Sequence, residues 1–329
     1  MIGDAPGDVP VTITGLGAYA PERVVTNDEL SELVDTSDEW IMERTGIRER
    51  RIAAEDQALS DLSLPAARQA LEQAGSDGSD IDLLIVATVT PDMMFPSTSA
   101  LLADQLGAKD AAAYDLSAGC TGFMYALAQA YGMVAAGLSR RALVVGGDVL
   151  SRVLDWTDRS TVVLFGDGAG AVVLERSEEA GFLAFELGAD GGGGEHLWLP
   201  GSGSRRFEDP DRLVKMNGRE VFKFATRVLV QSANAVLDRY GATIEDVDVY
   251  VPHQANVRII DHATKKLGIP SERVVVNVDR YGNTSSGSIP LALVDAQADG
   301  RLQAGSLVLM TGMGAGLTWG SALMRWTGK

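Results

Sequence analysis

Three polar side chains that could together carry out acyl transfer stand where apolar runs end and helical patterns begin. They are Cys120 in DLSAGCTGF, His253 in VPHQAN and Asn283 in GNTSSGS. A thiol supplies a nucleophile, an imidazole handles protons, and an amide donates a hydrogen bond to a developing oxyanion. Taken alone, a lone cysteine can be an inert filler, and a single histidine is more often structural. A structural role explains the three together poorly, so the set favours acyl transfer.

An internal repeat indicates that the chain is duplicated. Residues 70–86 align without a gap on residues 236–252 at a constant offset of 237 − 71 = 166. The alignment matches leucines at 71 and 237, glycines at 75 and 241, and aspartates at 82 and 248. We therefore expect two similar halves, residues 1–178 carrying the cysteine and residues 179–329 carrying the histidine and the asparagine.

The repeat predicts that the three side chains converge. Cys120 and Asn283 are expected at corresponding junctions, because Gly-Cys-Thr and Gly-Asn-Thr each follow a strand pattern, and His253 stands where Ala87 stands in the first half. Corresponding strand ends of a duplicated α/β chain meet near its pseudo-twofold axis, where such sheets bind ligands. Cys120 also precedes an apolar helical segment, and the positive end of a helix dipole is one arrangement that lowers a thiol pKa.

The elements that must position these groups alternate along the chain. Short β-branched runs predict buried strands at residues 82–89, 141–147, 248–253, 273–278 and 306–312. Apolar periodicity, often stopped by glycine, predicts helices at residues 64–75, 121–137, 220–241 and 257–268. Strands alternating with helices predict an α/β fold with parallel pairing and helical layers.

Composition excludes several classes of protein. The net charge of −17 argues against broad, sequence-independent binding to nucleic acid, which depends on cations placed on phosphates. No apolar run reaches the ~18 residues that a membrane-spanning helix needs, and the start lacks a signal-peptide pattern, so we expect no membrane and a cytoplasmic location. One cysteine and three histidines offer no internal disulfide and no zinc site of the usual spacing. We therefore expect no metal.

One stretch departs from the acidic average. Residues 205–280 carry thirteen Lys or Arg against eleven Asp or Glu, which is +2, while the remainder is −19. Within it Arg219, Lys223 and Arg227 fall at helical spacing on one face. From charge alone, a solvated helix face is the default interpretation.

The motifs resemble a known family. DLSAGCTGF, VPHQAN, GNTSSGS, TSDEWIMERTGIRERR, FGDGAGAVVL and GMGAGLTWGSAL are similar to β-ketoacyl-acyl carrier protein synthase III, the initiating condensing enzyme of type II fatty acid synthesis in the thiolase superfamily. The similarity runs from about residue 11 to the C-terminus, in family order. It implies a thiolase-like fold of two βαβαβ-type halves in α-β-α-β-α layers, a homodimer and no cofactor.

The resemblance also implies roles for the three candidate residues. Cys120 would take an acyl group from acyl-CoA, with the backbone N–H groups of Cys120 and Ala315 holding the oxyanion. His253 and Asn283 would stabilise the enolate that forms when malonyl-acyl carrier protein loses carbon dioxide. The products would be 3-oxoacyl-acyl carrier protein, CoA and carbon dioxide. The primer is expected to be acetyl-CoA or another short-chain acyl-CoA.

Binding residues follow from the same resemblance. Those implied to contact CoA and its pantetheine arm are Trp40, Arg44, Arg152, Gly218, Phe222, Ala255 and Asn256. Phe95 resembles a residue that crosses the dimer interface to close the partner's acyl pocket. The basic residues expected at the tunnel rim, where they would attract an acidic acyl carrier protein, are Arg219, Lys223, Arg227 and Arg258. Three positions depart from common family residues, namely Trp156, Arg219 and Ala315.

Other enzyme classes fit the sequence less well. GDGAGA leads into a strand pattern rather than a helix, which argues against a nicotinamide oxidoreductase. The chain contains no G-x-S-x-G elbow of a serine hydrolase. The remaining alternative is a related thiolase-fold acyltransferase or starter-unit synthase of polyketide or specialised metabolism.

Overall fold

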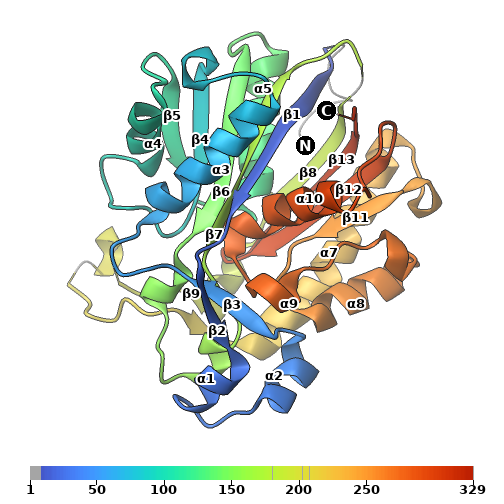
Figure 1. Cartoon of the computed structure of the whole chain (residues 1–329). Helices are drawn as coiled ribbons and strands as arrows, with labels where there is room; N and C mark the ends of the chain where they lie inside the picture. The colour runs from blue at the N-terminus through green and yellow to red at the C-terminus, as the bar shows by residue number, and fades with distance from the viewer. Residues whose placement is uncertain (1–8, 180, 202, 207, 329) are drawn as a thin grey trace.

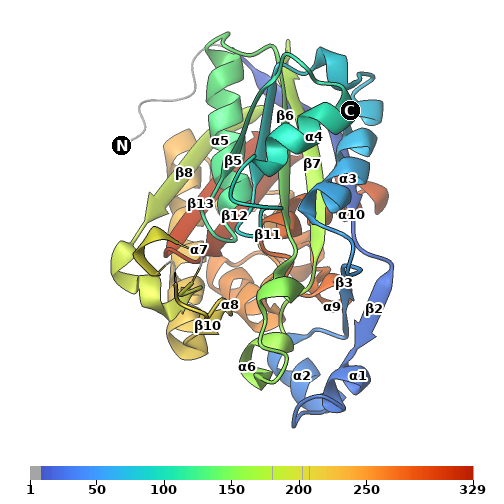
Figure 2. The ribbon, with the colours of Figure 1, turned by 90° about the vertical axis from the view of Figure 1, so that its left-hand side faces the viewer.

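The described residues form two large sheets with helices between and outside them (Figures 1 and 2). The structure is a computed structural model that describes residues 9–179, 181–201, 203–206 and 208–328. Two helices pack between the sheets, and two more cover the outer face of each sheet, in the layer order α-β-α-β-α. The α/β fold with helical layers, predicted from the sequence, is confirmed.

The two sheets repeat one strand order. The first is β1 (Val11–Tyr19), β7 (Gly168–Arg176), β6 (Arg141–Asp148), β4 (Leu83–Ala87) and β5 (Ala112–Leu116). The second is β8 (Phe182–Ala189), β13 (Thr318–Arg325), β12 (Leu307–Gly314) and β11 (Val249–Pro252). In each sheet the first two pairings are antiparallel and the next is parallel. The first sheet adds β5, which is parallel to β4.

Helices occupy matching places in the two halves. The outer helices are α3 (Leu59–Gln73) and α4 (Thr98–Leu106) on the first sheet, and α7 (Gly218–Tyr240) and α8 (Val257–Leu267) on the second. The central helices are α5 (Gly122–Ala135) and α10 (Ser288–Ala298). A smaller group, α1 (Asn27–Ser31), α2 (Asp38–Thr45), β2 (Arg23–Thr26) and β3 (Glu49–Ile52), forms the lower end of the molecule in Figure 1. The other short α-helices and strands of the described residues are α6 (Arg159–Val162), α9 (Val278–Tyr281), β9 (Leu197–Trp198) and β10 (Lys215–Met216).

The apolar runs form strands because both faces of each sheet are covered. In β4, Leu83 and Ile85 pack into the central core between the sheets, while Leu84 and Val86 pack under α3 and α4. A strand buried on both faces needs apolar residues at successive positions, and this produces the continuous runs seen in the sequence. The central helix α5 is apolar nearly all round for the same reason, because a sheet packs on either side of it.

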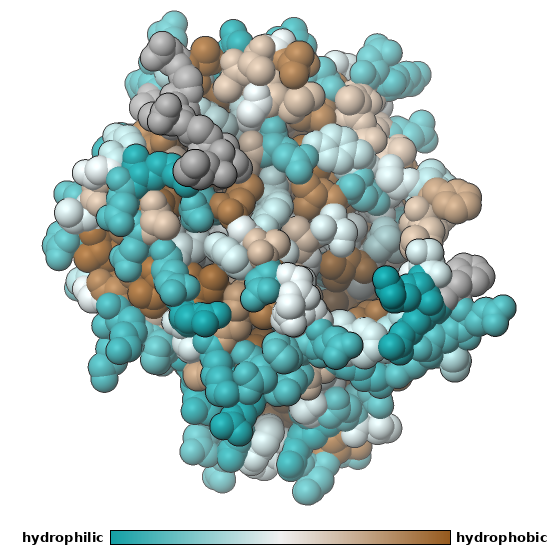
Figure 3. All heavy atoms as spheres, turned by 180° about the vertical axis from the view of Figure 1, so that it is seen from behind, coloured by the Kyte–Doolittle hydropathy of each residue, from teal (hydrophilic) through white to brown (hydrophobic). Residues whose placement is uncertain are grey.

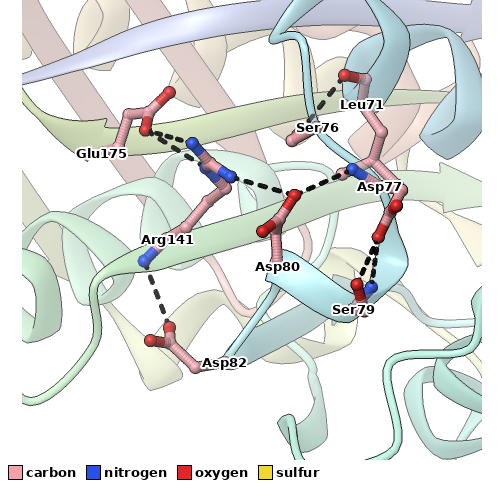
Figure 4. A network of polar contacts seen from close by, with 8 residues as sticks. All are labelled: Leu71, Ser76, Asp77, Ser79, Asp80, Asp82, Arg141 and Glu175. Atoms are coloured by element: carbon pink, nitrogen blue, oxygen red, sulfur yellow. Dashed lines mark hydrogen bonds and ion pairs between the residues drawn. The ribbon is translucent and has the colours of Figure 1, made fainter.

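The repeat offset of 166 holds at the level of hydrogen bonds. Asp82 accepts from the backbone N–H of Arg141 at 3.2 Å, and Asp248 accepts from that of Leu307 at 2.8 Å. These partners are also 307 − 141 = 166 residues apart. Figure 4 shows the first of these networks, in which Arg141 also binds Glu175. Both aspartates therefore fasten the start of a parallel pair, at the sheet end away from Cys120.

One predicted strand is absent. Residues 273–278 make a single parallel bridge, between Tyr250 and Val274, where the first half has β5. The side chain of Gln254 replaces a ladder there, since it donates to the Val275 carbonyl at 3.0 Å and accepts from the Asn277 N–H at 3.0 Å. The prediction was wrong because a side chain satisfies the backbone that a strand would otherwise pair.

The expected match of Cys120 with Asn283 is also shifted. The helices α5 and α10 begin at Gly122 and Ser288, which are 166 residues apart, so helix starts pair Cys120 with Ser286. Asn283 lies 286 − 283 = 3 residues before that position. A short 3-10 turn, Ser285–Gly287, fills the interval and moves the amide forward of its helix.

None of the helices in the described ranges is both long enough and apolar enough to cross a bilayer.

Candidate active site

Cys120 stands directly before α5, in a loop pressed against a second loop from the other half. Gly119 has φ 58°, and a Cβ there would lie 2.6 Å from the Ala315 carbonyl oxygen. A Cβ on Gly314 would lie 2.5 Å from the Cys120 nitrogen. Both glycines are needed because only a residue without a side chain allows backbones to approach this closely. As a result, the backbone N–H groups of Cys120 and Ala315 both interact with the thiol.

The three candidate catalytic residues line one cavity. Its volume is about 160 Å³, and its walls include Cys120, His253 and Asn283. The predicted pantetheine residues line the same space, namely Gly218, Phe222, Ala255 and Asn256. The structure therefore brings together residues from both halves of the chain that lie up to 163 positions apart, since 283 − 120 = 163.

A second cavity begins on another side of the thiol. It also measures about 160 Å³, and Cys120, Phe165 and Leu197 border both cavities. Its other walls are mostly apolar and include Val89, Leu150, Val153, Trp198, Leu199 and Val214. Cys120 thus lies at the junction of a tunnel with polar catalytic groups and an apolar pocket suited to a hydrocarbon chain.

His253 is a neutral, buried imidazole. It follows β11 and is only 1% exposed, and its backbone N–H donates to the Thr311 carbonyl at 2.7 Å. Burial lowers the pKa of His253 to about 3. Its Nδ1 lies 2.5 Å from the Ser288 hydroxyl, whereas Nε2 has no hydrogen-bond partner among the described residues. Nε2 is therefore free for a substrate atom.

Asn283 is held by backbone and side chain together. Its N–H donates to the Leu164 carbonyl at 2.8 Å, and its carbonyl accepts from Gly166 N–H at 3.0 Å. The side-chain oxygen accepts from the Ser285 N–H at 2.9 Å. Because the oxygen is already occupied, the amide NH₂ is the group available to the cavity.

The thiol is protonated in the resting chain. Burial, with a smaller contribution from the nearby Asp148, raises the pKa of Cys120 to about 11. The Ser285 hydroxyl and the two backbone N–H groups act in the opposite direction but do not offset burial. The dipole of α5 is expected to lower the thiol pKa, and burial acts on that pKa in the opposite direction.

Asp148 is a buried carboxyl that sequence reasoning missed. It ends β6 and accepts from the Thr88 hydroxyl at 2.8 Å, from Val89 N–H at 2.8 Å and from Ser286 N–H at 3.3 Å. Burial raises its pKa, while these donors lower it. The carboxyl ties a wall of the apolar pocket to the turn that follows Asn283. A motif search does not find it because its partners are backbone and hydroxyl groups distant in the sequence.

Two guanidinium groups enclose the predicted CoA tryptophan. Arg44 lies 4.4 Å and Arg159 lies 4.7 Å from the ring centroid of Trp40. Arg152 does not join them, because its guanidinium donates to the Ala54 and Gln57 carbonyls. Arg159 was missed although LSRVLDWTDR contains both arginines. The Asn256 side chain donates to the Arg44 carbonyl at 3.0 Å, which links this group to the tunnel.

Hydrophilic residues predominate at the lower end of the molecule in Figure 3, where α1 and α2 lie in Figure 1.

The four predicted rim cations are all exposed. Arg258 lies 5.7 Å from the ring centroid of the tunnel residue Phe222. Lys223 lies beside Phe222 on α7, and its ammonium group pairs with the Glu220 carboxylate at 2.7 Å. Arg227 instead borders a separate groove that also contains Glu186 and Asp190.

Phe95 lies outside both cavities. It is 85% exposed and follows Met94, which is 75% exposed. Met93 and Met94 border a larger hollow of about 550 Å³, and Val89 and Thr90 border both this hollow and the apolar pocket. The apolar segment Met93, Met94 and Phe95 therefore lies on the surface, next to the wall of the apolar pocket that Val89 and Thr90 form.

The duplicated sheets, with a thiol, an imidazole and an amide around one cavity between the halves, define a thiolase-like acyl-transferring enzyme. Comparison with known proteins agrees. Residues 114–191 match the family model 3-oxoacyl-[acyl-carrier-protein] synthase III, and residues 237–326 match its C-terminal model. The β-ketoacyl-[acyl-carrier-protein] synthase III of Symbiobacterium thermophilum is 54% identical over 324 residues, covering 96% of this chain and 98% of the relative.

Solved structures give the same result. The crystal structure of 3-oxoacyl-[acyl-carrier-protein] synthase III from Aquifex aeolicus superposes with a TM-score of 0.92 and 47% identity, over 96% of this chain and 100% of that one. A priming β-ketosynthase of a polyketide pathway superposes with the same TM-score of 0.92 and 40% identity, over 100% of this chain and 99% of that one. The chain belongs to the β-ketoacyl-acyl carrier protein synthase III family, as the sequence motifs predicted.

Proposed function

We propose that the protein condenses a short-chain acyl-CoA with malonyl-acyl carrier protein, forming 3-oxoacyl-acyl carrier protein, CoA and carbon dioxide. This is the initiating condensation of fatty acid synthesis. The observation that carries the proposal is the single cavity lined by Cys120, His253 and Asn283 in a chain of this family. The activity needs no cofactor, since the thioester supplies the activation and decarboxylation drives the condensation.

In the first half-reaction, the Cys120 sulfur attacks the acyl-CoA carbonyl. The N–H groups of Cys120 and Ala315, which already interact with the sulfur, are placed to stabilise the oxyanion of the tetrahedral intermediate. When the intermediate collapses, CoA leaves as its thiol with the proton that the cysteine released. The acyl group remains on sulfur, and its chain enters the apolar pocket.

In the second half-reaction, the malonyl thioester oxygen accepts hydrogen bonds from His253 Nε2 and the Asn283 amide. These donors stabilise the enolate that forms as the carboxylate leaves as carbon dioxide. The enolate carbon then attacks the acyl-Cys120 carbonyl, a carbon–carbon bond forms and the carbon–sulfur bond breaks. The cysteine thiolate takes up one proton from solvent, which restores the resting thiol. His253 is suited to this role because its unpartnered Nε2 faces no competing protein group among the described residues.

The size of the apolar pocket favours a short primer. Its volume of about 160 Å³ and its mostly apolar walls suit an acyl chain of a few carbons. A panel of acyl-CoA primers of increasing length measures this directly. We expect acetyl-CoA or another short-chain primer to give the highest kcat/KM.

The surroundings of Trp40 suggest how the nucleotide end of CoA is bound. An adenine ring can replace one guanidinium and stack against the indole, leaving the other cation to cover it. We assign Arg44 and Arg159 to this site, and we assign Arg152 to holding the loop at residues 54–57.

Two further proposals concern partners. Arg258 and Lys223 are assigned to contact acyl carrier protein at the tunnel mouth, supported by their exposure and their closeness to Phe222. A homodimer is supported by the family resemblance and by the exposed apolar segment that ends at Phe95.

The deciding experiment for the overall reaction incubates the protein with acetyl-CoA and malonyl-acyl carrier protein and follows acetoacetyl-acyl carrier protein by mass. Cys120→Ser serves as the inactive control. Formation of this product by the wild-type protein alone supports the proposal. Acylation of Cys120 without condensation on malonyl-acyl carrier protein would instead favour the alternative of an acyltransferase in specialised metabolism.

A further inference from the structure

The hydroxyl of Ser288 is the immediate neighbour of His253 inside the protein. Ser288 is the first residue of α10 and is 1% exposed, and its Oγ lies 2.5 Å from His253 Nδ1. The same oxygen accepts from the backbone N–H of Gln254 at 3.3 Å. The sequence motif does not distinguish Ser288 from the neighbouring Ser285 and Ser286. Its contact with His253 joins two residues 35 positions apart, so only the folded chain shows it.

Counting protons at this oxygen decides which ring nitrogen of His253 carries hydrogen. Among the described residues, Ser288 Oγ has two polar neighbours, and the Gln254 N–H must donate to it. If Nδ1 also donated, the buried serine hydrogen would have no acceptor, which costs roughly 1–3 kcal/mol. If the hydroxyl donates to Nδ1 instead, the serine oxygen, its hydrogen and Nδ1 all have partners, and only Nε2, which faces the cavity, is left open. The neutral imidazole then carries its proton on Nε2.

We propose that Ser288 is a positioning residue that fixes His253 in the Nε2–H tautomer, so that the imidazole presents a hydrogen-bond donor to the tunnel. Two rigid attachments support this geometry. The backbone of His253 is bonded to Thr311, and Gln254 is bonded at both ends of its side-chain amide. The ring therefore has little freedom to turn away from the serine.

The inference rests on the proposed function for its kinetic consequence. An Nε2–H imidazole can donate to a malonyl enolate oxygen, but it cannot accept a proton from the Cys120 thiol through that nitrogen. Ser288 therefore assigns His253 to the condensation half-reaction and excludes it from acylation. The opposite tautomer would present a lone pair to the enolate oxygen and repel it.

The first test reads the tautomer directly, without substrate. The protein has three histidines, so selective ¹⁵N labelling and a long-range ¹⁵N–¹H spectrum resolve His253, assigned by its absence in His253→Ala. With a pKa of about 3, His253 stays neutral throughout a titration from pH 6 to 8. We expect a pyrrole-type nitrogen at Nε2 and a pyridine-type nitrogen at Nδ1. The reverse pattern in the wild-type protein would overturn the proposal.

The second test compares variants. Ser288→Ala should shift the His253 tautomer toward a mixture and slow malonyl decarboxylation roughly 5- to 100-fold, while acylation of Cys120 stays within about twofold. The matched control is Ser232→Ala. It removes a different buried hydroxyl, which belongs to α7 and lies 2.7 Å from the Ser321 hydroxyl. The control should change neither the tautomer nor the split between half-reactions.

Equal loss of both half-reactions in Ser288→Ala, with an unchanged histidine spectrum, would show a purely structural role and reject the proposal. The two failures remain distinguishable. If the wild-type protein forms no acetoacetyl product, the proposed function fails, but the tautomer measurement still stands on its own.

Discussion

Burial moves the two ionisable groups of the site in opposite directions. It raises the pKa of Cys120 to about 11 and lowers that of His253 to about 3, so each group is neutral at pH 7. A neutral thiol beside a neutral imidazole is stable in an apolar cavity, because neither needs a counter-ion. The charge must then appear only when substrate arrives, where backbone donors can stabilise it.

The first prediction is the pH dependence of thiol reactivity. An acid whose pKa lies near 11 is almost fully protonated at pH 7, so the thiolate fraction rises about tenfold for each pH unit up to that value. Alkylation of Cys120 by iodoacetamide, followed by intact mass, should therefore keep accelerating from pH 7 to pH 9. A plateau below pH 8 would show that the thiol pKa is depressed and would contradict the burial argument.

At the residue scale the sequence pointed to three polar side chains that the structure places around one cavity, but it did not give their electrostatics. Cys120, His253 and Asn283 were recognisable because three reactive groups recur at strand ends. The protonation states of Cys120 and His253 were not recognisable from the sequence, because they depend on burial of both side chains by segments from both halves. Arg159 illustrates the same boundary, since only the folded chain shows which of two nearby arginines reaches Trp40.

At the scale of elements, α2 and the short helix α6 place Trp40 and Arg159 face to face. Arg159 also donates to the Asp35 carbonyl at 2.6 Å, which holds its side chain near the α2 end. Arg152 lies earlier in the same connection and points to another loop. The two arginines therefore have separable roles.

Arg159→Ala should raise the KM for acetyl-CoA by about 2- to 5-fold, the worth of an exposed cation–π contact. Acetyl-pantetheine, which lacks the nucleotide, should keep its KM in the same variant. Steady-state kinetics with both substrates measures this difference. An equal rise for both substrates would indicate a disturbed loop rather than a lost adenine contact.

Strands were predicted where both faces are covered and missed where a side chain replaces a neighbour strand. The runs that became β4, β6, β11 and β12 are apolar at successive positions because helices cover one face and the central layer covers the other. Residues 273–278 have the same apolar character. Their backbone instead bonds to Gln254, and no local pattern announces that partner.

At the scale of the whole molecule, an acidic enzyme must bind a partner that is also expected to be acidic. The net charge of −17 repels such a partner at long range, so local cations must guide the encounter. Arg258 and Lys223 lie near the tunnel, whereas Arg227 faces a groove with two acidic residues. The predicted basic stripe therefore divides between two surfaces.

Arg258→Glu and Lys223→Glu should raise the KM for malonyl-acyl carrier protein, and more strongly at low salt, because exposed charges are screened within roughly 10 Å at 0.1 M ionic strength. Acylation by acetyl-CoA should change little. Arg227→Glu is the matched control and should have the smaller effect. An equal loss in Arg227→Glu would place that residue in the same contact, and no change in either KM would return the stripe to an ordinary solvated face.

The exposed apolar segment gives a prediction about assembly. Phe95→Glu and Met94→Glu place charge on side chains that are 85% and 75% exposed, so the folded subunit should tolerate them. If this segment lies in a homodimer interface, light scattering should show a shift from dimer to monomer. Leu138→Glu, at another site that is 73% exposed, is the control and should leave the oligomeric state unchanged. A wild-type monomer, or variants that remain dimeric, would contradict this use of the segment.

The duplication was visible in the sequence because the offset of 166 is constant through residues 70–86 and their partners. The geometry at the pseudo-twofold axis was not visible in the sequence, because an added 3-10 turn separates Asn283 from the start of its helix. That turn separates the amide from the position equivalent to Cys120 and lets both groups border one cavity. The arrangement of the proposed catalytic groups therefore depends on where the two halves differ.

The separation of the two half-reactions tests the central claim most directly. His253→Ala and Asn283→Ala are each incubated with acetyl-CoA, and acyl-Cys120 is measured by intact mass. The same variants are then assayed for carbon dioxide release from malonyl-acyl carrier protein. We predict near-normal acylation and a loss of decarboxylation of about two orders of magnitude, because removing one preorganised oxyanion donor costs roughly 3 to 4 kcal/mol. Loss of acylation with retained decarboxylation would contradict the assignment of Cys120, His253 and Asn283.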